Sequence, residues 1–366
     1  MSIPPATRWL CRTRIARLGT RAFLVAPRMV VALILCSAAT LAAQEPAQPQ
    51  APVQPLPCRG DAARVEWLSL APPGDRATLD LWCDSVGPPL LVAGRPESAA
   101  AAVVVVSWNI HVGHAEVERL IEWIDRAPEV AKPYALVLLL QEAVRGGPEV
   151  PAAVPPGMEP PGEIRAREGT LDVAAMAARF GLHAAYVPSM RNGRLFAPDA
   201  QQDRGNAILS THPLSRARAI ELPFFRQRRV AVAATVAVPG FAPLDVMTMH
   251  LDAKGKRTEQ AKALAPHLGA LAARGPLVAG GDLNTWSGGR RETAFKVLDA
   301  VLPEDACGRG PTNTWPLRLH LFFGWWRGRL DYMFSNLDAS GIERRCETID
   351  RQFDSDHNPV VMVIHH

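Results

Sequence analysis

The sequence has little net charge, few cysteines, and no internal repeat that would indicate a repeat architecture. Its 40 basic and 36 acidic residues leave a formal charge of +4. Bulk charge therefore gives no reason to expect a polyanionic partner. A membrane-spanning helix needs about 20 apolar residues, and the apolar stretch at residues 30–43 is shorter than that.

The N-terminus has the pattern of an export signal. Residues 1–28 contain six arginines and no acidic residue, and the apolar stretch that follows ends in small residues. A basic region, an apolar region and a small-residue cleavage site predict a signal peptide over residues 1–43, with an uncleaved N-terminal membrane anchor as the alternative. Removing residues 1–44 takes away six positive charges and moves the net charge from +4 to −2. The sequence thus predicts an exported protein, periplasmic or extracellular.

Four cysteines remain after the predicted leader, namely Cys58, Cys83, Cys307 and Cys346. Export to an oxidising compartment would permit two disulfides. A local Cys58–Cys83 bond is the pairing we predict, because it would fasten a short Pro-rich segment. Four free buried thiols are the alternative.

The rest of the chain divides into three parts. Residues 44–57 are rich in Gln, Pro and Ala and predict a disordered linker. Residues 58–99 are predicted to form an N-terminal extension, and residues 100–366 the main domain. Apolar runs predict strands at 103–106, 135–140, 207–209, 230–238, 244–249, 277–279, 330–334 and 360–364, and helices near 117–124, 257–273 and 292–302. This order favours a mixed α/β domain with more than one sheet.

Polar residues stand at or just past the ends of these apolar strands. Asn109 follows the first strand and Glu142 follows the second, while His250 and Asp282 end two later ones. An Asp356-His357 pair directly precedes the last strand, and strand ends are where rigid scaffolds present catalytic groups. Carboxylates and amides suit Mg²⁺, which prefers oxygen ligands and keeps several waters. Imidazole suits an acid, a base or a phosphate donor instead. The set is therefore typical of phosphate-ester cleavage.

The strings SWNIHVG, LLLQEAVR, RGNAILS, VMTMHLDA, AGGDLNTW, RLDYMF and SDHNPVV carry a family resemblance. From about Val103 to the C-terminus the chain resembles the endonuclease/exonuclease/phosphatase superfamily, which includes deoxyribonuclease I-like and sphingomyelinase-like metal-dependent phosphoesterases. The resemblance implies a four-layer α/β/β/α sandwich of two mixed β-sheets flanked by helices. It also implies a catalytic domain over residues 100–366, with the site at one edge of the two sheets.

The resemblance implies a Mg²⁺ site, with Mn²⁺ as a substitute. Glu142 would be the principal carboxylate ligand. Asn109 would help to hold the waters of the metal site, and Asp356 would belong to the metal side.

The resemblance also implies the catalytic roles. Asp282 would position or deprotonate the attacking water, and Asn284 would donate to a phosphate oxygen. His357, steadied by Asp331, would bind the scissile phosphate or move a proton. His250 would donate to the phosphate or protonate the leaving oxygen. Attack would be in line, with inversion at phosphorus and no covalent intermediate.

Several neighbouring residues have two interpretations. Asn206 would contact substrate or only fix the start of its strand, and Arg229 would lie near the phosphate or be a solvated surface residue. His111 and His114 would approach the site from the loop after Asn109 or be surface loop residues, and we favour the second interpretation. Gly280 and Gly281 are expected to let backbone pass close to the phosphate or metal.

The substrate remains open between three phosphate esters. A nuclease is favoured and requires basic residues for backbone phosphates. The alternative is a sphingomyelinase-like lipid phosphodiesterase, for which the aromatic stretch 319–326 would dock on a membrane. A phosphomonoesterase, or a non-catalytic binding protein on the same scaffold, ranks lower. No protein partner is predicted, and the Pro-rich loop 148–161 is expected to cover the site. The candidate basic residues are Arg191, Arg194, Arg204, Arg226, Arg228, Arg229, Lys254, Lys256 and Arg257.

Overall fold

The computed structural model describes residues 64–69, 75–95, 99–153, 155–156, 169–192, 201–286, 288–305, 307, 315–317 and 326–365. These residues all belong to one compact unit, residues 51–366. The predicted leader and linker lie outside the described residues, as do Cys58 and most of the aromatic stretch 319–326. None of the described helices is long and apolar enough to cross a membrane.

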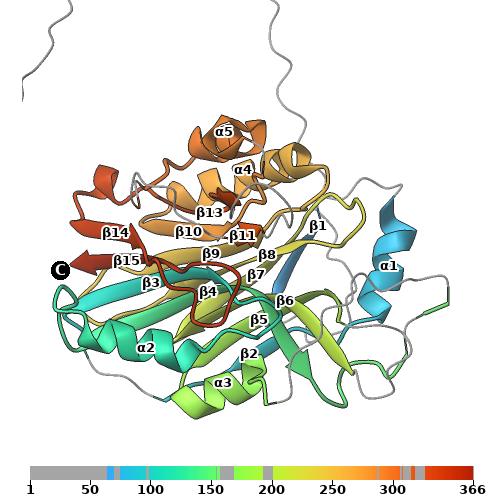
Figure 1. Cartoon of the computed structure of the whole chain (residues 1–366), viewed down its shortest axis with the longest axis horizontal. Coiled ribbons are helices and arrows are strands. Elements are labelled where there is room, and N and C mark those ends of the chain that lie inside the picture. Colours follow the sequence, from blue (N-terminus) through green and yellow to red (C-terminus); the bar gives the residue numbers. More distant parts are fainter. Residues whose placement is uncertain are drawn as a thin grey trace, which may run out of the picture. The chain divides into compact units, whose positions relative to one another are not determined.

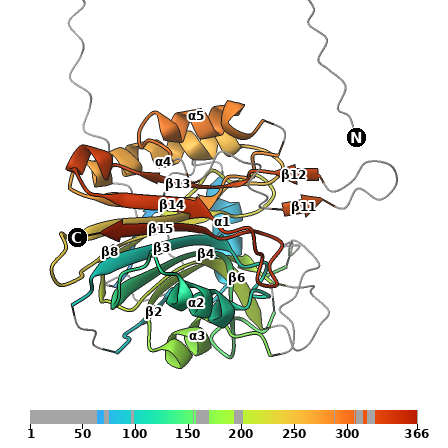
Figure 2. The same ribbon diagram turned by 60° about the vertical axis from the view of Figure 1, so that its left-hand side comes forward.

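Two large β-sheets dominate the described residues. The first has the strand order β1 (Glu66–Ser69), β7 (Leu214–Glu221), β8 (Val230–Val236), β9 (Leu244–His250), β10 (Leu277–Asp282) and β13 (Asp331–Ser335). The second has the order β14 (Arg344–Thr348), β15 (Val360–His365), β3 (Ala102–Asn109), β4 (Tyr134–Gly146), β6 (Gln202–Ser210), β5 (His183–Arg191) and β2 (Leu90–Val92). A separate antiparallel pair, β11 (Trp315–Leu317) and β12 (Trp326–Gly328), lies beside the sandwich (Figure 2).

The two sheets pack face to face, and helices cover their outer faces (Figure 1). Helices α4 (Arg257–Ala272) and α5 (Thr293–Asp299) cover the first sheet, while α2 (Val117–Arg126) and α3 (Val173–Phe180) cover the second. Helix α1 (Arg76–Asp84) and two short 3-10 turns, Gly289–Arg291 and Asp338–Ser340, complete the described helices. The predicted α/β/β/α sandwich of two mixed sheets is confirmed.

The valine run of β3 shows why the layers form. Val103 and Val105 belong to the core between the two sheets. Val104 and Val106 belong instead to the core beneath α2 and α3. Side chains alternate along a strand, so a strand buried on both faces needs a continuous apolar run. A third core lies under α4 and α5 and includes Leu264.

The sequence missed some elements and misjudged the length of others. Strand β4 runs to Gly146 rather than Leu140, because a β-bulge lets it continue through the polar residues Gln141 and Glu142. Helix α5 is shorter than predicted, and β5, β7, β14 and α3 were not predicted. Strands β1 and β2, from the segment predicted as an extension, pair with β7 and β5.

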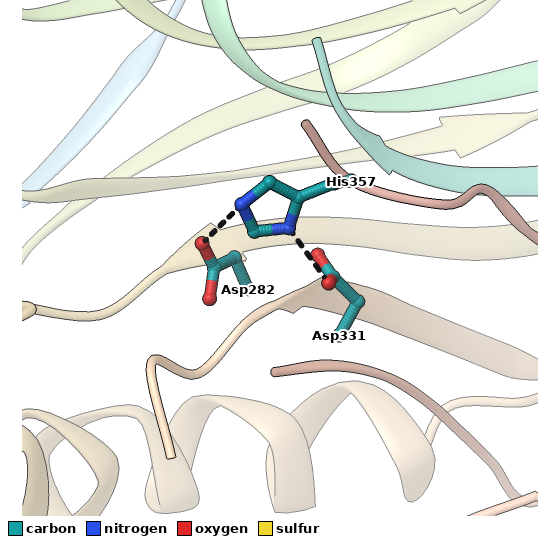
Figure 3. Close-up of side chains that lie close together, drawn as sticks. All are labelled: Asp282, Asp331 and His357. Carbon is teal, nitrogen blue, oxygen red and sulfur yellow. Dashed lines mark hydrogen bonds and ion pairs between the residues drawn. The ribbon is translucent and has the colours of Figure 1, made fainter. Parts of the chain in front are cut away.

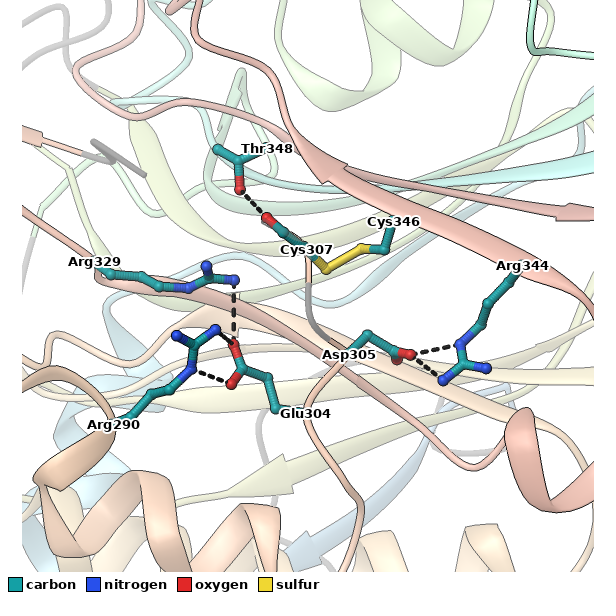
Figure 4. Close-up of a disulfide and its surroundings, with 8 residues drawn as sticks. All are labelled: Arg290, Glu304, Asp305, Cys307, Arg329, Arg344, Cys346 and Thr348. Carbon is teal, nitrogen blue, oxygen red and sulfur yellow. Dashed lines mark hydrogen bonds and ion pairs between the residues drawn. A yellow bond between two sulfur atoms is a disulfide. The ribbon is translucent and has the colours of Figure 1, made fainter. Parts of the chain in front are cut away.

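A disulfide joins Cys307, which follows the β-bridge of Glu304 with Phe334, to Cys346 in β14 (Figure 4). The Cys307 carbonyl accepts a hydrogen bond from the Thr348 hydroxyl at 3.2 Å. Beside it, Arg344 pairs with the buried carboxylate of Asp305. Cys83 is also disulfide-bonded, and the predicted partner Cys58 is not among the described residues.

We expect the double substitution Cys307→Ser/Cys346→Ser to lower the free energy of unfolding. The bond closes a sequence separation of 39 residues, and a loop of that length corresponds to about 4 kcal/mol in the chain-entropy model. Urea unfolding of the wild type and the double variant measures the difference. Equal unfolding midpoints would contradict this expectation.

Candidate active site

Three of the predicted site residues occupy adjacent positions across the first sheet. His250 at the end of β9 is the register partner of Asp282 at the end of β10. Asp282 is in turn opposite Asp331, the first residue of β13. In the second sheet, Asn109 at the end of β3 is opposite Gln141 of β4. The strand ends of both sheets therefore present polar side chains at one edge of the sandwich.

Direct hydrogen bonds join the two sheets at this edge. The Asn109 Nδ2 donates to Asp282 Oδ2 at 3.1 Å, and Gln141 Nε2 donates to Thr248 Oγ1 at 2.9 Å. A Cβ atom at Gly280 would come within 2.5 Å of Ser107 Cβ in the opposite sheet. Gly280 therefore allows the two sheets to approach each other. We had expected it to let the backbone pass close to the phosphate or metal.

His357 lies between two carboxylates (Figure 3). Its Nδ1 is 2.8 Å from Asp331 Oδ2, and its Nε2 is 3.8 Å from Asp282 Oδ2. The loop that carries His357 is fixed to β3, because the Trp108 indole donates to the His357 carbonyl and the Ser355 hydroxyl donates to the Asn109 carbonyl. The segments that supply these side chains are far apart in the sequence and rigidly joined.

The pKa values of His357 and Asp282 both differ from their ordinary values. Burial alone would lower the pKa of His357, but Asp331, Asp282 and Asp356 raise it to about 10. Burial and the neighbouring Asp331 raise the pKa of Asp282 to about 7, against the lowering effect of His357. Near neutral pH, His357 is therefore a cation and Asp282 exchanges protons readily. Such divergent titrations are typical of acid–base pairs.

His250 has the opposite electrostatic environment. Arg229 Nη1 is 3.0 Å from its Nδ1, and its Nε2 is 3.4 Å from Asp282 Oδ2. Burial and the positive charges of Arg229 and His357 lower the pKa of His250 well below its usual range. Because a guanidinium can only donate, Nδ1 accepts and the ring proton of neutral His250 is on Nε2. His250 thus directs a neutral N–H donor toward Asp282.

Glu142 is placed by the bulge in β4. Its backbone has a left-handed φ of 55°, and such bulges re-aim side chains beside active sites. No described residue donates a side-chain hydrogen bond to its carboxylate, and the nearest cation, Arg204 Nη1, is 3.8 Å from Oε2. Burial opposes ionisation, but Arg204, Arg229 and His357 lower the pKa of Glu142 below its ordinary value. Glu142 is therefore an ionised carboxylate with unused ligand capacity.

Asp356 and His111 lie at the rim. His111 Nδ1 is 3.6 Å from Asp356 Oδ1, which is 4.0 Å from His357 Nε2. His111 has a left-handed φ of 46° and follows Asn109, whose Oδ1 accepts from the His111 backbone N–H. The structure therefore places His111 beside predicted site residues, which was the alternative to a surface loop position. Its position two residues past Asn109 was the signal available in the sequence.

The two predicted asparagines and Arg229 are all buried. Asn284 Nδ2 donates to the Leu251 carbonyl at 2.9 Å, and its second N–H remains available for a phosphate oxygen. Asn206 Nδ2 donates to the Val230 carbonyl at 2.7 Å and so ties β6 to β8. Arg229 is 6% exposed, so it is not a solvated surface residue.

Two groups of side chains could hold a divalent ion. The ligand atoms of Asp282, Asp331 and His357 lie within 4.8 Å of one another. An ion there would have to break the short hydrogen bond of His357 to Asp331 and remove the proton from the imidazolium. Glu142 offers an ionised, under-coordinated carboxylate, and the charges of His111 and His357, which both lie near Asp356, also act on it. Such a carboxylate fits a hard ion that retains waters.

The structure reduces the set of basic residues that could bind a polyanion. Arg228 is fully buried and paired with Glu221, and Arg257 pairs with Glu292. Arg191 is buried and donates to backbone carbonyls of the 151–152 segment. Arg194, residues 157–161 of the predicted covering loop and the aromatic stretch 319–325 lie outside the described residues.

We expect the stability of the metal-free protein to fall as pH rises above neutrality. The pKa of His357 is raised from 6.5 to about 10, so its stabilising contribution is fully present below pH 6.5 and is lost toward pH 10. The loss amounts to at most about 5 kcal/mol. Urea unfolding in EDTA between pH 7.5 and 10 measures the slope. A His357→Gln variant with the same slope as the wild type would contradict this assignment.

The chain was compared with curated proteins and with solved structures. No curated protein matches the chain. Similar solved structures include an endonuclease/exonuclease/phosphatase from Beutenbergia cavernae DSM 12333, with 21% identity over 72% of each chain and a TM-score of 0.49. The human Nocturnin catalytic domain with bound sulfate anion has 20% identity over 75% of this chain and 97% of that chain, with a TM-score of 0.47. D. rerio TDP2 complexed with single strand DNA product has 13% identity over 73% of this chain and 100% of that chain, with a TM-score of 0.47.

A family model covers most of the sequence. The model of the endonuclease/exonuclease/phosphatase family matches residues 106–357, a range that contains every predicted site residue from Asn109 to His357. The chain belongs to the endonuclease/exonuclease/phosphatase family, whose members are phosphoesterases.

Proposed function

We propose that this protein is an exported, Mg²⁺-dependent phosphodiesterase that hydrolyses nucleic acid or a related phosphodiester by in-line attack of water. The observation that carries the proposal is the position of Asp282. Its carboxylate accepts from Asn109, lies 3.4 Å from His250 Nε2 and 3.8 Å from His357 Nε2, and has a pKa of about 7. Asp282 can thus accept a proton near neutral pH, and the N–H groups around it are of a kind that can donate to phosphate oxygens.

Glu142 would hold the divalent ion, with Asp356 on the same side and waters completing the shell. Asn109 would act chiefly by orienting Asp282, because its Nδ2 and Oδ1 both have protein partners. When bound, Mg²⁺ would neutralise charge that develops on the phosphoryl oxygens. Mn²⁺ has the same ligand preference and would substitute.

The side chains of this chain would perform the remaining steps. Asp282 would orient the attacking water and accept its proton. His357, a cation held by Asp331, would bind a non-bridging oxygen of the phosphate. His250 would donate its Nε2 proton toward the phosphate or the leaving oxygen, and the second amide N–H of Asn284 would hold another oxygen. Fixed donors at developing charge are the largest contribution in such reactions.

Nucleic acid is the substrate we infer over lipid. Arg204 and Arg229 lie beside the site, and Arg226, Lys254 and Lys256 remain from the predicted set of basic residues. The export assignment rests on the basic and apolar leader of residues 1–43.

The assay compares plasmid DNA with sphingomyelin vesicles, each with Mg²⁺, using purified wild-type protein and an Asp282→Asn control. We expect DNA cleavage that the control lacks. Cleavage of vesicles alone would move the assignment to lipid. Cleavage of DNA by both proteins would refute the role of Asp282.

A further inference from the structure

Two buried arginines face the same carboxylate. Arg204 in β6 is 8% exposed and Arg229, just before β8, is 6% exposed. Both lower the pKa of Glu142, and the charge of Arg204 lowers the pKa of Arg229. The two guanidinium groups are thus close enough to repel each other, and the Glu142 carboxylate interacts with both.

The hydrogen-bonding capacity of these arginines is only partly used. Arg204 lies 3.8 Å from Glu142, which is longer than a hydrogen bond. It makes no side-chain hydrogen bond to any residue that the structure describes. Arg229 donates to His250 and Gln227, but its Nε is buried without a hydrogen-bond partner. Buried polar groups are rarely left in this state, and each such case needs an explanation.

The backbone around Arg204 has a special geometry. Bulges interrupt the pairing of β6 with β4 and with β5, one on each side of Gly205. A Cβ atom at Gly205 would lie 2.0 Å from the Val187 carbonyl oxygen, so glycine is required for this close approach. The bulges leave Gln141 and Glu142 of β4 and Ser189 of β5 without a register partner in β6.

The sequence neighbour of each arginine takes part in a buried ion pair. Asp203, next to Arg204, accepts from Arg145 at 2.6 Å and from the Tyr186 hydroxyl at 2.6 Å. Arg228, next to Arg229, makes a bidentate pair with Glu221 in which both side chains are fully buried. These pairs fix the backbone segments that carry the two arginines, which lowers the entropic cost of binding.

The arginines line a small pocket beside the catalytic cluster. Its lining side chains include Glu142, Ser189, Arg204, Asn206, Arg229 and His250. His250 belongs both to this pocket and to the cluster, because its Nε2 faces Asp282. The pocket is small and lined by buried side chains, and Arg204 and Arg229 are the positively charged residues in its lining.

We propose that Arg204 and Arg229 form an anion subsite for a second, terminal phosphate of the substrate, directly beside the scissile phosphodiester. This inference rests on the proposed function and specifies its substrate class, a phosphodiester with a phosphorylated end. Guanidinium groups suit this task because their planar donors match two phosphate oxygens at once.

The test uses four chromogenic esters with Mg²⁺. They are the p-nitrophenyl esters of thymidine 5′-phosphate and thymidine 3′-phosphate, each with and without a phosphate on the other hydroxyl. We expect kcat/KM to be about tenfold higher for the phosphorylated member of at least one pair, a difference that one additional charged contact can supply. Arg204→Met should remove this preference, and Arg204→Lys should retain part of it.

The matched control is Arg126→Met, because Arg126 has a side chain 77% exposed on α2 and should leave the preference intact. A second readout is calorimetric binding of inorganic phosphate in EDTA, which should weaken in Arg204→Met and not in the control. Equal kcat/KM within both pairs, or a preference that survives Arg204→Met, would overturn the subsite. Absence of p-nitrophenol release from all four esters would instead overturn the proposed function.

Discussion

His357→Ala is expected to lower kcat/KM for phosphodiester hydrolysis by about a thousandfold, within the range for a positioned acid–base or charge-stabilising group. The substitution removes a cation that Asp331 holds at 2.8 Å and that also lies 3.8 Å from Asp282. Its loss leaves two buried carboxylates without the charge between them. Hydrolysis of bis(p-nitrophenyl) phosphate measures the effect.

The companion variants separate chemistry from folding. Asp331→Asn removes the charge that holds His357 and that raises the pKa of Asp282, so we expect a smaller loss together with an altered pH–rate profile. His267→Ala on α4 is the matched histidine control and should retain wild-type activity. A His357→Ala protein that folds normally and keeps more than about a tenth of the wild-type rate would contradict the assigned role.

Glu142→Gln is expected to raise the Mg²⁺ concentration for half-maximal activity by about a hundredfold or more, because even outer-shell changes at metal sites cost 10- to 100-fold. The wild-type carboxylate is ionised, has no described hydrogen-bond donor and lies in a strained φ of 55°. The amide keeps the size of the side chain and removes its charge. Activity as a function of Mg²⁺ concentration gives the midpoint.

Direct binding of Mn²⁺, followed by electron paramagnetic resonance, supplies a readout that does not depend on turnover. Glu149→Gln serves as the matched control, because Glu149 lies on the same chain segment and is exposed. The same metal affinity in Glu142→Gln and wild type would place the ion elsewhere, with Asp282, Asp331 and His357 as the remaining cluster.

Local sequence signals predicted the fold where a strand is buried on both faces. The valines of β3 belong to two different cores, one on each face of the strand. The resulting continuous apolar run identifies the strand from the sequence alone. Strand β5 was missed because it contains Pro188, and proline ordinarily argues against a strand interior. The structure accommodates it next to a bulge between Pro188 and Met190.

The sequence predicted which residues form the site but not how their side chains are arranged in space. Strand ends identified His250, Asp282 and Asn109, and sheet register places them together. Nothing in the sequence predicts the left-handed backbone of Glu142 or the ion pair between Arg145 and Asp203, which are 58 residues apart. Side chains so far apart in the sequence meet only when both sheets have formed. Arg204 stood in the RGNAILS string, but only the structure places it against Glu142.

The most direct test of the central claim is the rate of bis(p-nitrophenyl) phosphate hydrolysis by the purified protein, first in EDTA and then with Mg²⁺, beside the Asp282→Asn variant. We expect no measurable release of p-nitrophenol in EDTA, release on addition of Mg²⁺, and a loss of that release in the variant by about a thousandfold. Hydrolysis that persists in EDTA, or a variant as active as the wild type, would contradict it.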